Sequence, residues 1–354
     1  MTSQLTPIRA SLIGRRPEWL SFHIFYGSNP LGLLTRCVRP LVHQLKTEGK
    51  LERWFYINYW LEGNHIRLRL GVPDKATATE VEMRVTVAVE EYLALNPSFH
   101  PAAELESTDY YAELFEAEFS AEERGQYFNA DGTPILQPDN SVRIRRYEPE
   151  WDRYGGAKGV EIAEEHFELS AEIASKLIAK GNMSVRSFQL GVGAELMAVL
   201  VGVLFPNPAT GRAFLENYHA RWSGMFGTTK NYVERHNQGR FTDNRRVMMN
   251  HVVPVCQAAR AGGHGLTGVL KEWHDAVTHT RNRLEDVGRN EELRFAWEGG
   301  EETTSDIDRL CWREGFSLQH MMDNRLLLSV SDEAYLSFEL LKALETADVD
   351  EVAV

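Results

Sequence analysis

The sequence predicts an α+β fold, with a mixed or antiparallel sheet in the N-terminal half and a largely helical C-terminal half. The first hundred residues contain aromatic and apolar segments with the two-residue period of strands, and two of them are only three residues apart. After Tyr154-Gly155-Gly156 the apolar residues follow helical spacing almost to the end of the chain. We therefore expect one domain over 1–354, strand-rich over 17–156 and helical over 157–346, with an acidic tail over 347–354.

The first predicted strand is WLSFHIFY, residues 19–26, which alternates and then stops at a Gly-Ser-Asn-Pro sequence. Apolar residues at helical spacing predict a helix over 31–45. A hairpin is expected next, because apolar runs over 54–61 and 65–72 flank Glu62-Gly63-Asn64. The remaining expectations for this half are a helix over 77–95, an irregular stretch over 96–140 and a strand over 141–147.

The C-terminal half shows helical periodicity with breaks at Gly181-Asn182 and at Phe205-Pro206-Asn207-Pro208. Acidic residues gather in the last segment, from Glu345 to Val354, and we expect it to fray. The predicted helices cover residues 158–180, 184–204, 209–224, 243–261, 266–287, 304–322 and 332–346.

The composition limits the classes of function. A formal net charge of -13 argues against broad electrostatic binding of nucleic acid or of an anionic membrane. The cations are nevertheless 29 arginines against 9 lysines, and arginine is the residue best suited to gripping carboxylates. The chain lacks a signal-peptide core, and its longest apolar run, Leu196 to Phe205, is too short to span a bilayer. We expect a soluble, cytoplasmic protein.

The sequence gives no reason to expect a metal or an organic cofactor. The three cysteines (Cys37, Cys256 and Cys311) lie far apart and form no metal-binding spacing. The chain has no HExxH, Walker, GxSxG or strand-linked GxGxxG motif.

The most informative stretch is HIRLRL, residues 65–70. On a strand, His65, Arg67 and Arg69 share one face, because successive side chains point to opposite sides. Such a face offers a row of donors for a multiply charged anion. The alternative is an exposed strand with solvated arginines.

A second candidate segment, YEPEWDRYGG, covers residues 147–156 and follows Arg143, Arg145 and Arg146. Glu150 and Arg153 are three residues apart, so on a helical turn they would be neighbours. This pair alone predicts no more than a local surface ion pair. The Tyr-Gly-Gly sequence predicts a tight bend or a close backbone approach.

The third segment runs from Ser317 to Arg325 and contains His320, Asn324 and Arg325. A histidine titrates near neutrality and can act as a general acid or base. The alternative is a helix-face histidine with a satisfied hydrogen bond. Spacing and periodicity alone lead only to a soluble α+β protein with a candidate anion site.

These segments occur together and in order, and with them the chain resembles the C-terminal elimination domain of class I lantibiotic dehydratases, also called the thiopeptide-type bacteriocin biosynthesis family. The entry strand 19–27, the hairpin segments 53–60 and 65–69, the segment 147–156 and the segment 317–325 carry the resemblance. One position departs from the family pattern: Asn58 stands where the family often has arginine.

The resemblance implies a stand-alone eliminating enzyme without metal or cofactor. It would remove glutamate from O-glutamylated Ser or Thr of a precursor peptide and leave dehydroalanine or dehydrobutyrine. It assigns catalytic roles to Arg67, Arg69, Arg153, Glu150 and His320. The residues expected to bind substrate are His65, Arg143, Arg145, Tyr147, Asn324 and Arg325.

Two other functions are compatible with the resemblance. One is the pyridine synthase reaction of thiopeptide synthesis, a [4+2] cycloaddition of two dehydroalanines on a related fold. The other is a non-catalytic scaffold that binds the leader peptide. The expected partners are a precursor peptide with leader and core and a separate tRNA-dependent glutamylating protein, without direct contact to nucleic acid or membrane. A homodimer is left open.

Overall fold

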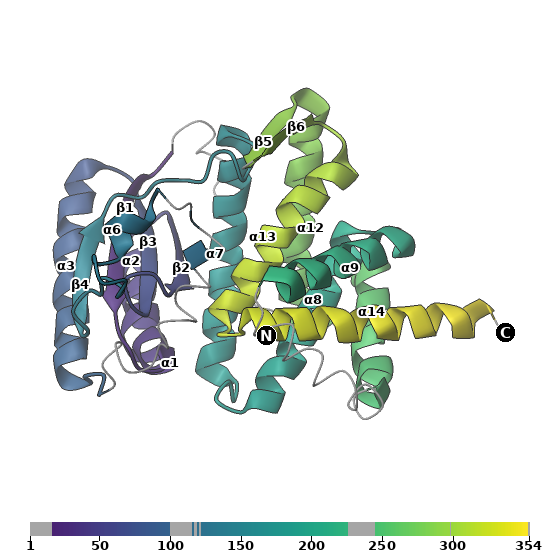
Figure 1. Cartoon of the computed structure of the whole chain (residues 1–354), viewed down its shortest axis with the longest axis horizontal. Helices are drawn as coiled ribbons and strands as arrows, with labels where there is room; N and C mark the ends of the chain where they lie inside the picture. The colour runs from purple at the N-terminus through teal and green to yellow at the C-terminus, as the bar shows by residue number, and fades with distance from the viewer. Residues whose placement is uncertain are drawn as a thin grey trace.

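The computed structural model describes residues 16–99, 115–116, 119, 122–225, 245–297 and 299–352. A sheet with its covering helices forms one side of the molecule and a bundle of helices forms the other, with α7 (Ala157–Lys180) between them (Figure 1). This arrangement confirms the predicted α+β division into a strand-rich and a helical half.

The four strands of the main sheet pair in the order β2-β3-β1-β4, and every pair is antiparallel. Phe22 lies opposite Leu68 on one side and Ile144 on the other, and Tyr56 lies opposite Leu68 across the predicted hairpin. The strands are β1 (Glu18–Phe25), β2 (Arg53–Tyr59), β3 (His65–Val72) and β4 (Ser141–Arg145), the last of which ends two residues earlier than predicted.

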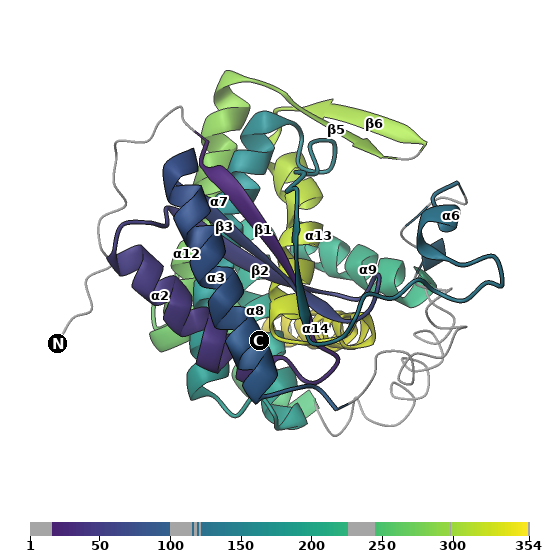
Figure 2. The same ribbon diagram turned by 90° about the vertical axis from the view of Figure 1, so that its left-hand side faces the viewer.

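The two faces of the sheet differ in chemistry. Side chains such as Phe22, Ile24 and Leu68 are almost completely buried, and each contributes about 1.5–3 kcal/mol of burial free energy. Figure 2 shows α2 and α3 in front of this sheet. The covering segments are α1 (Leu31–Leu33), the π-helical turn η1 (Leu34–Val38), α2 (Arg39–Thr47) and α3 (Lys75–Leu95).

The opposite face of the sheet carries the polar residues and turns toward the helical half. The predicted irregular region contains only the short helix α6 (Arg124–Tyr127) among its described residues. The helices of the C-terminal half are α7, α8 (Arg186–Leu204), α9 (Pro208–Met225), the π-helical turn η2 (Met248–Val252), α11 (Val253–Arg260), α12 (Gly268–Asn290), α13 (Ile307–Arg325) and α14 (Val330–Val352).

This half differs from the expectations in two places. A two-stranded hairpin, β5 (Leu293–Trp297) and β6 (Gly300–Thr304), separates α12 from α13. The acidic end does not fray at residue 347, because α14 continues to Val352. Its Ala and Glu residues are good helix formers, and its N-terminal half packs against α9.

One helix is apolar enough to be confused with a membrane span. Among the described residues only α8 has the length and composition to cross a bilayer, and 67% of its most apolar window is buried inside the protein. Gly202 allows this close packing, since a Cβ atom there would come 2.6 Å from the carbonyl oxygen of Cys256 on α11. We therefore interpret α8 as a core helix.

The helix α7 joins the two halves. It packs against β2 on one side and against α12 and α13 on the other. Phe167 on α7 meets Phe55 on β2, with ring centroids 5.3 Å apart. One continuous cluster of buried side chains therefore runs from the sheet into the helices.

Candidate functional site

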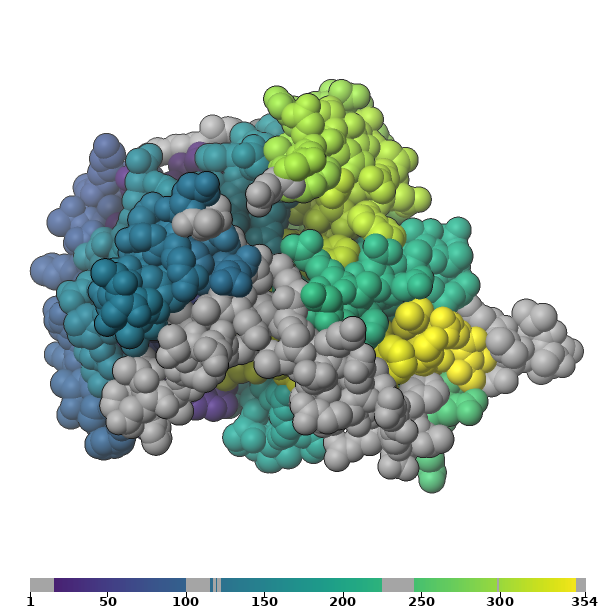
Figure 3. Space-filling view, in the orientation of Figure 1, coloured from purple at the N-terminus to yellow at the C-terminus, as the bar shows by residue number. Residues whose placement is uncertain are grey.

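A cavity of about 1750 Å³ lies between the polar face of the sheet and the helical half. Figure 3 shows the surface hollowed between the segment around α6 and the β5–β6 hairpin. Strands β2 and β3 line one wall, and helices α9, α13 and the start of α14 line the other. The segment 147–154, strand β5, helix α7 and residues 26–30 also contribute to the lining.

The strand β3 brings His65, Arg67 and Arg69 to this cavity on one face, as predicted. Arg69 is only 6% exposed, and its guanidinium donates a 2.5 Å hydrogen bond to Ser21 on β1. Burial lowers the pKa of Arg69 to about 9, which leaves the side chain charged at neutral pH. The guanidinium carbon of Arg67 lies 3.4 Å from the ring centroid of Tyr59.

The neighbouring His65 is held neutral. Burial is the main cause that lowers the pKa of His65 to about 3, and the charges of Arg67 and Arg69 act in the same direction. The Nδ1 atom of His65 lies 2.8 Å from the carbonyl oxygen of Gly63 and donates to it. Its Nε2 atom is then an acceptor for the Nε–H of Arg67, 3.4 Å away. His65 therefore helps to position the guanidinium group of Arg67.

Tyr147 also lines the cavity, and a carboxyl group that the sequence did not indicate holds it in place. Its hydroxyl donates to Glu164 on α7 over 3.1 Å, and Arg16 donates to the same oxygen over 2.6 Å. The guanidinium of Arg69 lies 5.5 Å from the Tyr147 ring centroid. Burial, partly offset by the charge of Arg16, raises the pKa of Glu164. Tyr147 contacts the charged group of Arg69 and shapes this part of the wall.

The segment that follows Tyr147 contributes Glu150 and Arg153. Their side chains form the predicted pair, with 3.2 Å between Arg153 Nη1 and Glu150 Oε1, and both remain largely exposed to the cavity. The predicted bend is present, because Gly155 has a φ of +72° and a Cβ there would lie 2.8 Å from Leu293. The glycine lets this segment approach β5.

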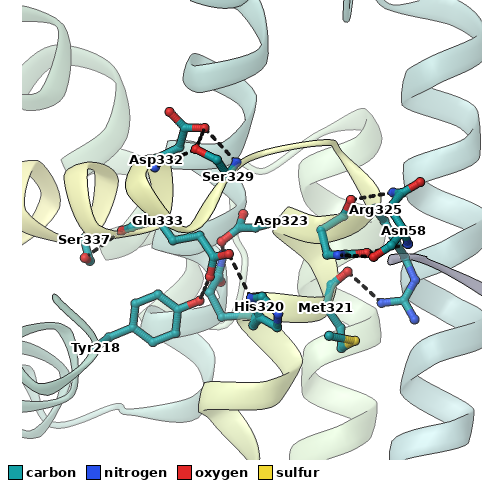
Figure 4. A network of polar contacts seen from close by, with 12 residues as sticks. Asn58, Tyr218, His320, Met321, Asp323, Arg325, Ser329, Asp332, Glu333 and Ser337 are labelled. Atoms are coloured by element: carbon teal, nitrogen blue, oxygen red, sulfur yellow. Dashed lines mark hydrogen bonds and ion pairs between the residues drawn. The ribbon is translucent and has the colours of Figure 1, made fainter. Parts of the chain in front are cut away.

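The helical wall presents His320 on α13 (Figure 4). The Nδ1 atom of His320 lies 2.8 Å from Oε1 of Glu333 at the start of α14, and Glu333 is fully buried. The other oxygen of Glu333 accepts a hydrogen bond from the Tyr218 hydroxyl. Trp222 packs on the imidazole with 4.8 Å between ring centroids. This arrangement fixes the imidazole and leaves Nε2 as its second nitrogen.

A second buried acid lies behind this pair. Asp323 is completely buried, and the side-chain amide of Gln319 donates to it over 2.8 Å. Burial is the largest cause that raises the pKa of Asp323, followed by the charge of Glu333. Burial and the charge of Glu333 thus both favour the protonated form of Asp323, while Glu333 receives two hydrogen bonds.

Tyr218, Glu333 and Arg221 also belong to the site but were not predicted from the sequence. Glu333 stands in the first turn of a helix, where acidic residues are usually explained by the helix dipole. Tyr218 and Arg221 lie in α9, outside the segments that carry the family resemblance. Their spacing of three residues places both on one side of α9 and was the one available signal.

Asn324 lines the cavity but also acts as a structural clasp. Its side-chain oxygen accepts from the Asn58 backbone N–H over 2.8 Å, and its side-chain nitrogen donates to the Asn58 carbonyl over 2.8 Å. The Asn58 side chain donates back to the Asn324 carbonyl over 2.7 Å. Helix α13 is thereby fastened to the edge of β2.

Three of the predicted substrate-binding residues do not line the cavity. Arg325 is fully buried, donates to the Met321 carbonyl over 2.9 Å and lies above the ring of Phe167, so its position is structural. Arg143 and Arg145 share the polar face of the sheet but stand on the edge strand β4, outside the cavity lining. Arg145 is paired with Glu62 over 2.9 Å.

The described residues contain no group of three or more His, Cys, Asp or Glu side chains arranged to hold a metal ion. The cavity chemistry among them consists of guanidinium groups, carboxylates, aromatic rings and one histidine held by a buried acid.

A family model described as "Lantibiotic biosynthesis dehydratase C-term" matches residues 19–344. The chain belongs to this family. The match spans the sheet, the cavity and most of the helical half, and it confirms the resemblance carried by the three motif segments. A comparison with curated protein sequences found no match.

Solved structures share this fold. The pyridine synthase TbtD from thiomuracin biosynthesis has a TM-score of 0.67 at 19% identity, with 96% of this chain and 100% of that chain covered. The protein TsrL has a TM-score of 0.59 at 16% identity, covering 93% and 94%. The tRNA-dependent lantibiotic dehydratase MibB from Microbispora sp. 107891 has a TM-score of 0.53 at 17% identity, covering 96% of this chain and 29% of MibB.

Proposed function

We propose that this family member is a lyase that eliminates glutamate from O-glutamylated Ser or Thr residues of a ribosomally made precursor peptide. The observation that carries the proposal is the meeting of Arg67, Arg69 and Arg153 with His320 around one cavity. The family match supports a place in lantibiotic biosynthesis, and similarity to TbtD extends the proposal to thiopeptide biosynthesis.

The reaction breaks two bonds of the glutamylated residue. A base removes the α-proton, the electron pair forms the Cα–Cβ double bond, and the Cβ–O bond breaks so that glutamate leaves as a carboxylate. His320 is suited to accept the proton on Nε2, because Glu333 accepts a hydrogen bond from Nδ1–H and stabilises the imidazolium that forms.

The arginines are suited to stabilise the charge that develops. Arg67 and Arg69 present fixed guanidinium groups on the sheet wall, and these can neutralise the enolate-like transition state and the departing carboxylate. Arg153 adds a third cation from the segment 147–154, and its pairing with Glu150 supports an orienting role for that carboxylate.

The proposed partners follow from this chemistry. The substrate would be a precursor peptide with leader and core, and a separate tRNA-dependent protein would attach the glutamate. The likeness to MibB, whose title names a tRNA-dependent lantibiotic dehydratase, supports this division of labour. The formal net charge of -13 disfavours tRNA binding by this chain itself.

A second function is favoured by a separate observation. The pyridine synthase TbtD matches over its full length with the highest TM-score of the three structures described above. A pyridine synthase has no glutamate to bind, so it has no evident use for the guanidinium groups of Arg67, Arg69 and Arg153 in this cavity. We therefore rank elimination first.

The test uses purified protein and a glutamylated precursor peptide that includes its leader. Mass spectrometry should show the loss of glutamate and the gain of a dehydro residue. A peptide already bearing dehydroalanines serves as the second substrate, and its conversion to a macrocycle with leader release, without any glutamate loss from the first, would contradict elimination. If neither peptide reacts, although both bind, the chain is a scaffold.

A further inference from the structure

Arg221 is a cation of the cavity that none of the sequence motifs includes. It belongs to α9 and lines the same cavity as His320. Its guanidinium carbon lies 5.9 Å from the ring centroid of Trp222 and 5.8 Å from that of Phe316. Trp222 also packs on His320, so Arg221 and the proposed base have contacts with the same aromatic ring.

Within the described residues, no carboxylate lies within ion-pairing distance of Arg221, whereas Arg153 and Arg313, which also line the cavity, are each paired with a glutamate. Arg313, for comparison, is paired with Glu302 and stacked over Trp297 at 4.1 Å. The contacts of Arg221 within the part of the chain that the structure describes are with these two aromatic rings. Its charge is therefore available to a ligand.

Arg153 lies near enough for its charge to act on Arg221. After burial, the charge of Arg153 is the largest cause that lowers the pKa of Arg221. Two like charges brought together in a cavity repel each other unless an anion lies between them. The cavity thus contains two cationic poles, Arg67 with Arg69 on the sheet wall and Arg153 with Arg221 on the helical side.

We propose that Arg221 and Arg153 bind the free carboxylate of the glutamyl group, while Arg67 and Arg69 hold the carboxylate that leaves. This inference rests on the proposed elimination and makes Arg221 a residue that determines the specificity for an acidic acyl group.

The burial of the two poles supports this assignment. Arg69 is 6% exposed, whereas the side chain of Arg153 is 45% exposed. A desolvated cation stabilises most strongly a charge that appears in the transition state, as on the leaving carboxylate. A hydrated cation suits a carboxylate that is charged before and after the reaction.

The experiment compares two ester substrates on the same precursor peptide, one acylated with glutamate and the other with glutamine. These esters differ only in whether the free end of the acyl group is charged. Release of the amino acid is measured for the wild type, for Arg221→Gln and Arg221→Lys, and for Arg212→Gln, a control on the same helix that does not line the cavity.

The wild type should release glutamate about 100-fold faster than glutamine, since charge-assisted bidentate contacts are lost with the amide. Arg221→Gln should abolish most of this preference by slowing the glutamyl ester alone, Arg221→Lys should retain part of it, and Arg212→Gln should resemble the wild type.

The two levels of the proposal fail differently. If the wild type releases glutamate but Arg221→Gln slows both esters equally or neither, the carboxylate subsite is overturned and elimination stands. If the wild type releases neither amino acid while circular dichroism shows it folded, elimination itself is wrong and the subsite falls with it.

Discussion

The Nδ1 atom of His320 and the Oε1 atom of Glu333 lie 2.8 Å apart, and Glu333 is fully buried. A buried carboxylate that accepts from one imidazole nitrogen fixes the tautomer, so the basic nitrogen is Nε2. The Tyr218 hydroxyl donates to the same carboxylate, and burial raises the pKa of Asp323 behind it. The pairing leads to the first prediction.

Glu333→Gln should reduce the rate of elimination about 10- to 100-fold, because it removes a charged hydrogen-bond partner of His320 while preserving its shape. His320→Ala should reduce the rate by about 10²- to 10⁴-fold, the usual range for a general base. The rate constants are measured in single-turnover reactions with the glutamylated peptide. An unchanged rate in both variants would exclude His320 as the base.

Arg67→Gln should lower the elimination rate by about 10²- to 10³-fold, as expected for a donor that stabilises developing charge. Arg143→Gln is the matched control, since Arg143 lies on the same sheet face but outside the cavity lining. The rates of the two variants are compared at saturating peptide. An equal loss in both would show that the whole sheet face, and not the cavity, binds the substrate.

Asn324→Ala should lower the free energy of unfolding by about 2–4 kcal/mol, because it leaves the N–H and the carbonyl of Asn58 without their partners. Urea titration followed by circular dichroism measures the change. Asn58→Ala keeps both of those bonds and loses only the bond to the Asn324 carbonyl, so it should cost less. The reverse order would contradict the clasp.

The stability of the Glu314→Gln variant relative to the wild type, measured as the free energy of unfolding, should increase as the pH rises. Glu314 is buried without a hydrogen-bond partner among the described residues, and this burial raises its pKa well above the usual range. The folded state therefore holds a proton that the unfolded state releases above about pH 4.5, so wild-type stability falls with pH in that range.

The measurement for Glu314 is the difference in free energy of unfolding between variant and wild type at pH 5 and pH 8. Relative to the wild type, the variant should be more stable at pH 8 than at pH 5. Glu91→Gln, at an exposed position of α3, is the control and should show a much smaller shift.

Much of the sheet could be predicted from the sequence, because its alternation is strong and its turns are short. The hairpin of β2 and β3 followed from Glu62-Gly63-Asn64 between two apolar runs, and the common face of His65, Arg67 and Arg69 followed from strand geometry. The β5–β6 hairpin could not be predicted, because the sequence of β6, GEETT, is polar. Thr303 and Thr304 are its only residues with a high strand propensity.

The helical wall of the site could be predicted only in part. His320 was found through its motif, but the contacts that position it cross from α13 to α9 and α14 and depend on tertiary packing. Arg325 shows the opposite error. Its motif predicted a substrate-binding residue, but its side chain is buried in the core. Periodicity gives the helices, and their docking decides which side chains meet.

The clasp between Asn58 and Asn324 also bears on when the enzyme becomes active. The cations of the sheet wall, Arg67 and Arg69, are synthesised well before the proposed base, His320, whose helix α13 is joined to the sheet at Asn58. A contact formed between residues 266 positions apart closes a long loop and comes late in folding. An incomplete chain would therefore carry an anion-binding surface with no means of removing a proton, and it could capture the acylated peptide without converting it.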